Sequence, residues 1–217
     1  MPDVSLTMPA RSQTLDVFAL VHDNATDFLT VAERPLESRE REANCILPHA
    51  RKYRDIERGR GLKPSPTPFE SRVHSSALPS RIHAPFDASQ PFHKQLWITL
   101  WSQRSVDPVL DFVITVTHSE IDNLPIFLWS SVDPVRLTKS FLVPRFTFIS
   151  RILCSLVPTS RVYSVFGPNI LTKFFADAWL EETRIRTYPK AYYEAALTFL
   201  TRDTLLEADP TRPSRQR

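Results

Sequence analysis

Glycine is scarce in this sequence: only three of the 217 residues are glycine, at Gly59, Gly61 and Gly167. An average usage of about 7% would predict roughly fifteen. A glycine-rich loop that brings backbone N–H groups close to a phosphate is therefore disfavoured. Neither G-x-x-x-x-G-K-[ST] nor G-x-S-x-G occurs, which argues against P-loop nucleotide hydrolases and serine hydrolases of the common types.

Cysteine is almost as rare, with Cys45 and Cys154 as the only two in the chain. Two cysteines make no disulfide framework, so we expect a reducing, intracellular setting. The segment His118-Ser119-Glu120 resembles the H-x-E half of a zinc deaminase site. The P-C-x-x-C half is missing, since the two cysteines stand 109 positions apart. We therefore expect no metal.

Long apolar runs and concentrated charge are absent as well. No window approaches the roughly 20 apolar residues of a membrane span, and the N-terminus carries no apolar run of signal-peptide length. The formal net charge is only +3, and the basic residues are dispersed. These features predict a cytoplasmic protein whose partners include neither a membrane nor nucleic acid.

The sequence does contain enough apolar material for a packed core, because 42% of its residues are hydrophobic and 14 are phenylalanine. A chain of this length is typically one domain with extensions. We predict a single domain over residues 14–201, with tails at 1–13 and 202–217. Six prolines, with serines among them, lie between Gly59 and Pro91, so about 59–91 is predicted to be a long inserted loop.

Hydrophobic periodicity predicts a mixed α/β order. Residues 14–21 are expected to form a strand, and residues 26–57 two helices that separate at Pro35. Strands at 96–102, 109–117 and 125–131 follow, joined by polar turns as an antiparallel meander. The remaining elements are a helix with Pro144 in its first turn, a strand at 161–166, a helix after Gly167-Pro168 and a strand at 192–201.

Several segments of the sequence resemble segments of a known family. They are EREANCILPHARK (40–52), LDFVITVT (110–117), PIFLW (125–129), FLVPRFTFISRIL (141–153), RVYSVFGPNILTKFFADAW (161–179) and AYYEAALTFL (191–200). With the order of elements, they resemble the GNAT superfamily of acyl-CoA N-acyltransferases, in a divergent fungal-type branch. The resemblance spans most of residues 14–201 outside the insertion. It implies a mostly antiparallel, splayed sheet flanked by helices.

The resemblance also implies a co-substrate, acetyl-CoA or another acyl-CoA, in the splay between the strands at 125–131 and 161–166. Its pyrophosphate would meet the N-terminus of the helix near Pro144, where unpaired N–H groups and the helix dipole attract phosphate. The candidate cofactor-binding residues are Arg136, Lys139, Arg145 and Asn169. Asn169 could instead cap the helix that it precedes.

The family's phosphate loop normally has the form Gln/Arg-x-x-Gly-x-Gly/Ala, and this sequence departs from it. Aligned on Arg145, the two small-residue positions hold Phe148 and Ser150. Two outcomes are open. Either residues 131–143 bind the cofactor in a different register, with Arg136 or Lys139 supplying charge, or the site does not bind acyl-CoA.

Acyl transfer to an amine needs a base that takes the ammonium proton. The candidate bases are Asp111, His118 and Glu120, of which His118 and Glu120 fall in a turn from which side chains could reach a substrate. Turn polarity alone also explains this pair.

The leaving thiolate needs an acid, which in the family is often a tyrosine a few residues beyond an asparagine. Asn169 is present, but Phe174, Phe175 and Ala176 follow it and no phenol does. The remaining candidates are Tyr163 on the preceding strand and Tyr192 and Tyr193 on the last one, where packing is the competing explanation.

We therefore expect an acetyl-CoA-dependent N-acyltransferase that acts on a small amine. The alternative is a noncatalytic binding or accessory protein of the same fold that has lost the glycine-rich cofactor loop.

Overall fold

The structure, a computed structural model, describes residues 16–61, 72–74, 95–103, 107–119, 122–188 and 190–195. The chain divides into two compact units, residues 1–185 and 186–217. In the described part of the second unit, residues 186–188 and 190–195, no helix or strand forms. The predicted strand at 192–201 is therefore absent over 192–195, and its remainder lies outside the described residues, as do both predicted tails.

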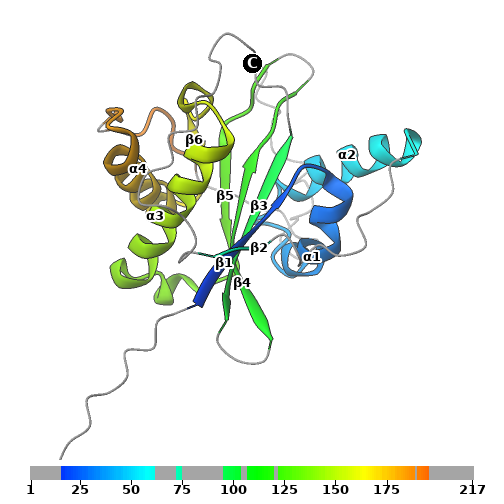
Figure 1. Cartoon of the computed structure of the whole chain (residues 1–217), viewed down its shortest axis with the longest axis horizontal. Coiled ribbons are helices and arrows are strands. Elements are labelled where there is room, and N and C mark those ends of the chain that lie inside the picture. The colour runs from blue at the N-terminus through cyan, green and yellow to red at the C-terminus, as the bar shows by residue number, and fades with distance from the viewer. Residues whose placement is uncertain are drawn as a thin grey trace, which may run out of the picture. The chain divides into compact units, whose positions relative to one another are not determined.

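The described part of the first unit contains a six-stranded sheet in the order β2-β1-β3-β4-β5-β6 (Figure 1). Its strands are β1 (Asp16–His22), β2 (Arg72–His74), β3 (Leu96–Gln103), β4 (Pro108–Val116), β5 (Ile126–Ser130) and β6 (Val165–Phe166). Neighbouring strands are antiparallel except β5 and β6, which are parallel. The predicted mixed α/β class, the meander and its mostly antiparallel sheet are confirmed. The short β2 lies within the segment predicted as a loop.

Helices cover both faces of this sheet, which explains why β3 and β4 are buried along most of their length. The helices α1 (Ala25–Glu37) and α2 (Leu47–Gly59) lie on one side, and α3 (Lys139–Leu156) and α4 (Asn169–Thr183) on the other (Figure 1). Side chains alternate between the two cores. Ile98 and Ile114 join the core beneath α3 and α4, whereas Trp97 and Val113 join the core beneath α1 and α2.

The helix pair α1 and α2 is joined by a buried carboxylate. Glu57, near the end of α2, accepts hydrogen bonds from the backbone N–H groups of Ala25 (2.7 Å) and Thr26 (2.9 Å) at the start of α1. It thereby satisfies donors that a helix N-terminus leaves unpaired. Pro35 lies inside α1, so the prediction that it separates the two helices is wrong, because the chain leaves α1 only after Glu37.

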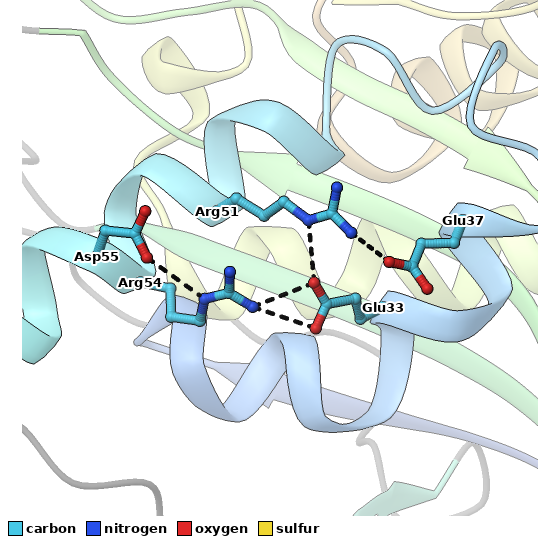
Figure 2. Close-up of polar contacts among 5 residues, drawn as sticks. All are labelled: Glu33, Glu37, Arg51, Arg54 and Asp55. Atoms are coloured by element: carbon cyan, nitrogen blue, oxygen red, sulfur yellow. Dashed lines mark hydrogen bonds and ion pairs between the residues drawn. The ribbon is translucent and has the colours of Figure 1, made fainter.

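A second set of contacts between α1 and α2 lies at the surface (Figure 2). Glu33 of α1 binds both Arg51 (3.0 Å) and Arg54 (3.1 Å) of α2, and Arg51 also reaches Glu37. Exposed ion pairs contribute little individually, so we expect this network to add only modestly to the stability of the helix pair.

Two element boundaries on the other side of the sheet differ from prediction. The helix α3 begins at Lys139, and Pro144 lies within it rather than at its first turn. A proline has no N–H, so the bond that would reach the carbonyl of Ser140 is missing. The predicted strand at 161–166 is confined to Val165–Phe166, since Arg161 belongs to a 3₁₀ turn, η2 (Thr159–Arg161).

The parallel pair at the sheet edge is short. Only Ile126 and Phe127 of β5 align with Val165 and Phe166 of β6, and beyond them the ladder ends. The predicted neighbour relation between these strands is confirmed. At the corner that follows, a Cβ on Gly167 would stand 2.8 Å from the carbonyl oxygen of Leu128, so the two backbones touch there.

Candidate functional site

The first turn of α3 borders an open hollow of about 610 Å³. Thr138, Lys139, Ser140, Val143 and Pro144 line it. The helix reaches this position because β5 ends at Ser130 and a 3₁₀ turn, η1 (Pro134–Arg136), leads into α3. The hollow therefore lies beyond the C-terminal end of β5, the strand next to the edge strand β6.

Backbone donors are available at this helix end. The N–H groups of Phe141 (3.1 Å) and Leu142 (2.9 Å) both donate to the carbonyl of Thr138. Among the described residues, the N–H groups of Lys139 and Ser140 have no backbone partner, and the Thr138 side chain caps neither. Unpaired helix donors with a neighbouring cation suit an anionic group.

The two candidate cations of residues 131–143 lie close along the chain to these donors. Arg136 ends η1, Lys139 is the first residue of α3, and both are exposed. Asp133, whose side chain accepts from the N–H of Val135 (2.9 Å), adds one carboxylate to the same turn. The local charge is therefore positive by one.

Arg145, the third predicted phosphate contact, is instead held inside the protein. Its guanidinium is 1% exposed and donates to Asp111 Oδ2 (2.8 Å) and to Ser102 Oγ (2.6 Å). Leu100 pairs with Phe112 and Trp101 with Leu110, so Asp111 is the extra residue of a β-bulge in β4. A phosphate contact by Arg145 stays a prediction, and it would require this buried pair to separate.

The other end of β5 holds two of the predicted catalytic residues. His118 follows β4, and its backbone carbonyl accepts hydrogen bonds from Tyr53 (3.0 Å) and Gln95 (3.0 Å). Tyr163 donates from its hydroxyl to the carbonyl of Asn123 (2.5 Å), and Asn123 forms a β-bridge with His118. The structure thus brings His118 and Tyr163 to one turn.

The predicted cofactor and catalytic residues are not clustered. His118 precedes β5, whereas Arg136 and Lys139 follow it, and a strand of 5 residues spans roughly 17 Å. Asn169 is exposed at the start of α4, where the N-cap is Pro168 and no side chain caps the helix. Glu120 lies outside the described residues. Tyr193 belongs to the second unit, where its side chain is exposed.

The sequence interpretation missed Arg161, which is 4% exposed and donates to the carbonyl of Thr117. It lay in a segment predicted to be a strand, and it was not among the candidate site residues. The local sequence carried no clear signal, because polar Thr159 and Ser160 directly precede the arginine.

Neither cysteine is an activated nucleophile. Burial and the nearby Glu182 raise the pKa of Cys154 to about 11, and burial raises the pKa of Cys45. Both thiols therefore remain protonated near neutral pH, which disfavours cysteine-based covalent catalysis.

No family model, no curated protein and no solved structure matches this chain. Within the described segments, no group of three or more His, Cys, Asp or Glu side chains is placed to hold a metal ion. The helices described here are too short or too polar for any of them to cross a lipid bilayer. The functional argument therefore depends on the geometry of the site itself.

Proposed function

We propose that this protein is a GNAT-type N-acyltransferase that transfers an acyl group from acetyl-CoA, or another acyl-CoA, to a small amine. The observation that carries the proposal is the parallel pair β5–β6 at the edge of an otherwise antiparallel sheet. Its ladder ends after two residues of each strand, and α3 begins just beyond β5. This is the arrangement that the family resemblance implies for an acyl-CoA site.

The N-terminal turn of α3 supports the cofactor half of the proposal. Free N–H groups at Lys139 and Ser140, with Arg136 nearby, favour the register through residues 131–143 over the one aligned on Arg145. Phe148 and Ser150 are buried in the middle of α3, away from its N-terminus. The pyrophosphate of acyl-CoA would accordingly bind at the hollow beside Lys139.

The separation of the two ends of β5 is compatible with acyl-CoA, because its pantetheine arm is long and extended. The arm would follow β5 from the hollow toward the turn that holds His118 and Tyr163. There His118, or Glu120, would accept the ammonium proton as the amine attacks the thioester carbonyl. Tyr163 would release its hydrogen bond to Asn123 and protonate the leaving thiolate.

A second candidate is a noncatalytic protein of the same fold. The specific observation in its favour is Arg145, which the bulged Asp111 and Ser102 already engage. The arginine at the position that aligns with the family's phosphate loop thus holds α3 against the sheet instead of facing a ligand.

The experiment that separates the two candidates incubates the protein with acetyl-CoA and a panel of small amines and follows release of the free thiol. Turnover that falls in a Lys139→Ala variant, with unfolding unchanged, supports the transferase. Arg58→Ala, which removes an exposed arginine far along the chain on α2, is the control and should leave the rate unchanged. Binding of acetyl-CoA without turnover on any amine favours the noncatalytic alternative.

A further inference from the structure

Two arginines of the described residues are almost fully buried, and they differ in how their charge is compensated. Arg145 faces the carboxylate of Asp111 at 2.8 Å. Arg161 is 4% exposed, yet none of the ion pairs among the described residues includes it. A buried cation without an anionic partner is costly, so it calls for an explanation.

The contacts of Arg161 leave part of its guanidinium unused. Nη2 donates to the carbonyl of Thr117, and the ring of Tyr163 lies 6.0 Å from Cζ. The buried Nη1 has no hydrogen-bond partner in the described structure. Thr117 is 1% exposed, and its hydroxyl is also buried without a partner there. Two unsatisfied donors therefore belong to residues already in contact.

The surroundings favour an anion. Burial lowers the pKa of Arg161, while the charges of Tyr163 and the exposed Asp122 raise it only in part. More than half of Tyr163 is exposed, and its ring is the aromatic neighbour of the Arg161 guanidinium.

We propose that Arg161 and Thr117 form a binding site for the carboxylate or phosphate group of a small molecule. Nη1 of Arg161 and the hydroxyl of Thr117 donate to the oxyanion, and the Tyr163 ring covers it from solvent. The ligand thereby places a negative charge in direct contact with the guanidinium, where the described residues form no ion pair. This proposal goes beyond acyl transfer and does not depend on it.

The test measures thermal unfolding of the full chain in sodium acetate and in sodium phosphate, each against sodium chloride at equal ionic strength. We expect a saturable rise in Tm with at least one of the two anions. A response to acetate alone assigns a carboxylate site, a response to phosphate alone assigns a phosphate site, and both responses support the proposal. Arg161→Met should weaken the apparent affinity by about tenfold or more, since a charge-assisted hydrogen bond is lost.

Two further variants keep the proposal falsifiable if Arg161→Met folds poorly. Thr117→Val keeps the carbonyl that holds Arg161 and removes only the hydroxyl, so it should weaken the anion response while leaving the fold intact. Arg58→Met removes an exposed arginine and should respond as the wild type does. An equal rise in Tm in the wild type, Thr117→Val and Arg58→Met would overturn the site, because the anion would then act elsewhere.

A further variant tests whether the chain itself, rather than a ligand, supplies the negative charge. Glu120 is the acidic residue that follows Thr117 by three positions in the sequence, so its carboxylate is the internal alternative to a ligand. No anion response in the wild type, together with a response that emerges in Glu120→Gln, would show that the chain itself neutralises Arg161. That result would overturn the proposal. A wild-type response that Glu120→Gln leaves unchanged supports it.

Discussion

Arg145 makes three hydrogen bonds from one buried guanidinium, to Asp111 (2.8 Å), to Ser102 (2.6 Å) and to the carbonyl of Phe141 (3.0 Å). The Phe141 ring also lies 3.7 Å from its Cζ atom. One side chain thus joins β3, β4 and α3. Its role in the fold follows from the geometry of the fork, which a lysine cannot reproduce.

Arg145→Met should lower the free energy of unfolding by about 3–5 kcal/mol, because Asp111 is left as a buried charge without its cation. The double variant Arg145→Met with Asp111→Asn should lose less than the sum of the two single variants, since it removes both charges together. Urea unfolding of the four proteins measures this coupling. Strictly additive losses would show that the two side chains do not act as a pair.

His22 is a buried histidine that makes part of the stability depend on pH. It is 4% exposed, its Nε2 lies 3.2 Å from the hydroxyl of Thr99, and burial lowers its pKa from 6.5 to about 4, against the charges of Asp27 and Asp23. The unfolded chain therefore binds a proton on His22 in a range where the folded chain does not. Stability from this residue is present above pH 6.5 and is lost as the pH falls toward 4.

We expect the free energy of unfolding to fall by about 3 kcal/mol more in the wild type than in His22→Gln over this range. Carboxylates titrate in both proteins, so the difference between the two urea-unfolding profiles isolates the histidine. Parallel profiles would mean that His22 is not buried as a neutral side chain.

Single residues of the candidate site were only partly predictable. The sequence drew attention to Arg145, but its partner Asp111 stands 34 positions earlier and reaches it only through a bulge in β4. Arg161 was hidden by the strand pattern around it. Lys139 was predicted as a charge near the start of a helix, and its position at the hollow required the true helix boundary.

At the scale of elements, periodicity predicted the long strands and the helix types because alternation and apolar faces are properties of the local sequence. The boundaries depend on tertiary contacts. Proline is a typical first-turn residue, yet α3 begins five residues before Pro144, at Lys139. The 3₁₀ turn η1 and the N-cap Thr138 directly precede it. Arg161 lies in the 3₁₀ turn η2 rather than in a strand, and its side chain donates to the carbonyl of Thr117.

The corner between β6 and α4 gives a test at this scale. Gly167→Ala would place a Cβ 2.8 Å from the Leu128 carbonyl oxygen and 3.0 Å from the Leu128 Cβ, so backbone must move. We expect a loss of about 1–3 kcal/mol, typical of overpacking. Denaturant unfolding measures it.

Gly59→Ala is the matched control. No atom lies within 4 Å of an added Cβ at this last residue of α2. The change should be neutral or stabilising by up to about 1 kcal/mol, because alanine favours the helix more than glycine does. Equal changes in the free energy of unfolding of the two variants would show that the close approach of Gly167 to Leu128 does not exclude a side chain there.

At the scale of the whole molecule, our proposal of an acyltransferase rests on the order of strands and helices. The mixed α/β class was predictable because the apolar patterns alternate between strand and helix periods along the chain. The proposed cofactor site was predictable only as one of two alternatives, because the three glycines of the sequence lie outside the turn before α3. In our proposal, recognition there depends on helix donors and on two cations.

Calorimetric titration of the protein with acetyl-CoA tests the central claim most directly. We expect a saturating heat with a dissociation constant tighter than about 1 mM. We also expect binding about tenfold weaker in Lys139→Ala and unchanged binding in Arg58→Ala. No heat from the folded wild-type protein at millimolar acetyl-CoA would contradict the claim that this fold holds an acyl-CoA site.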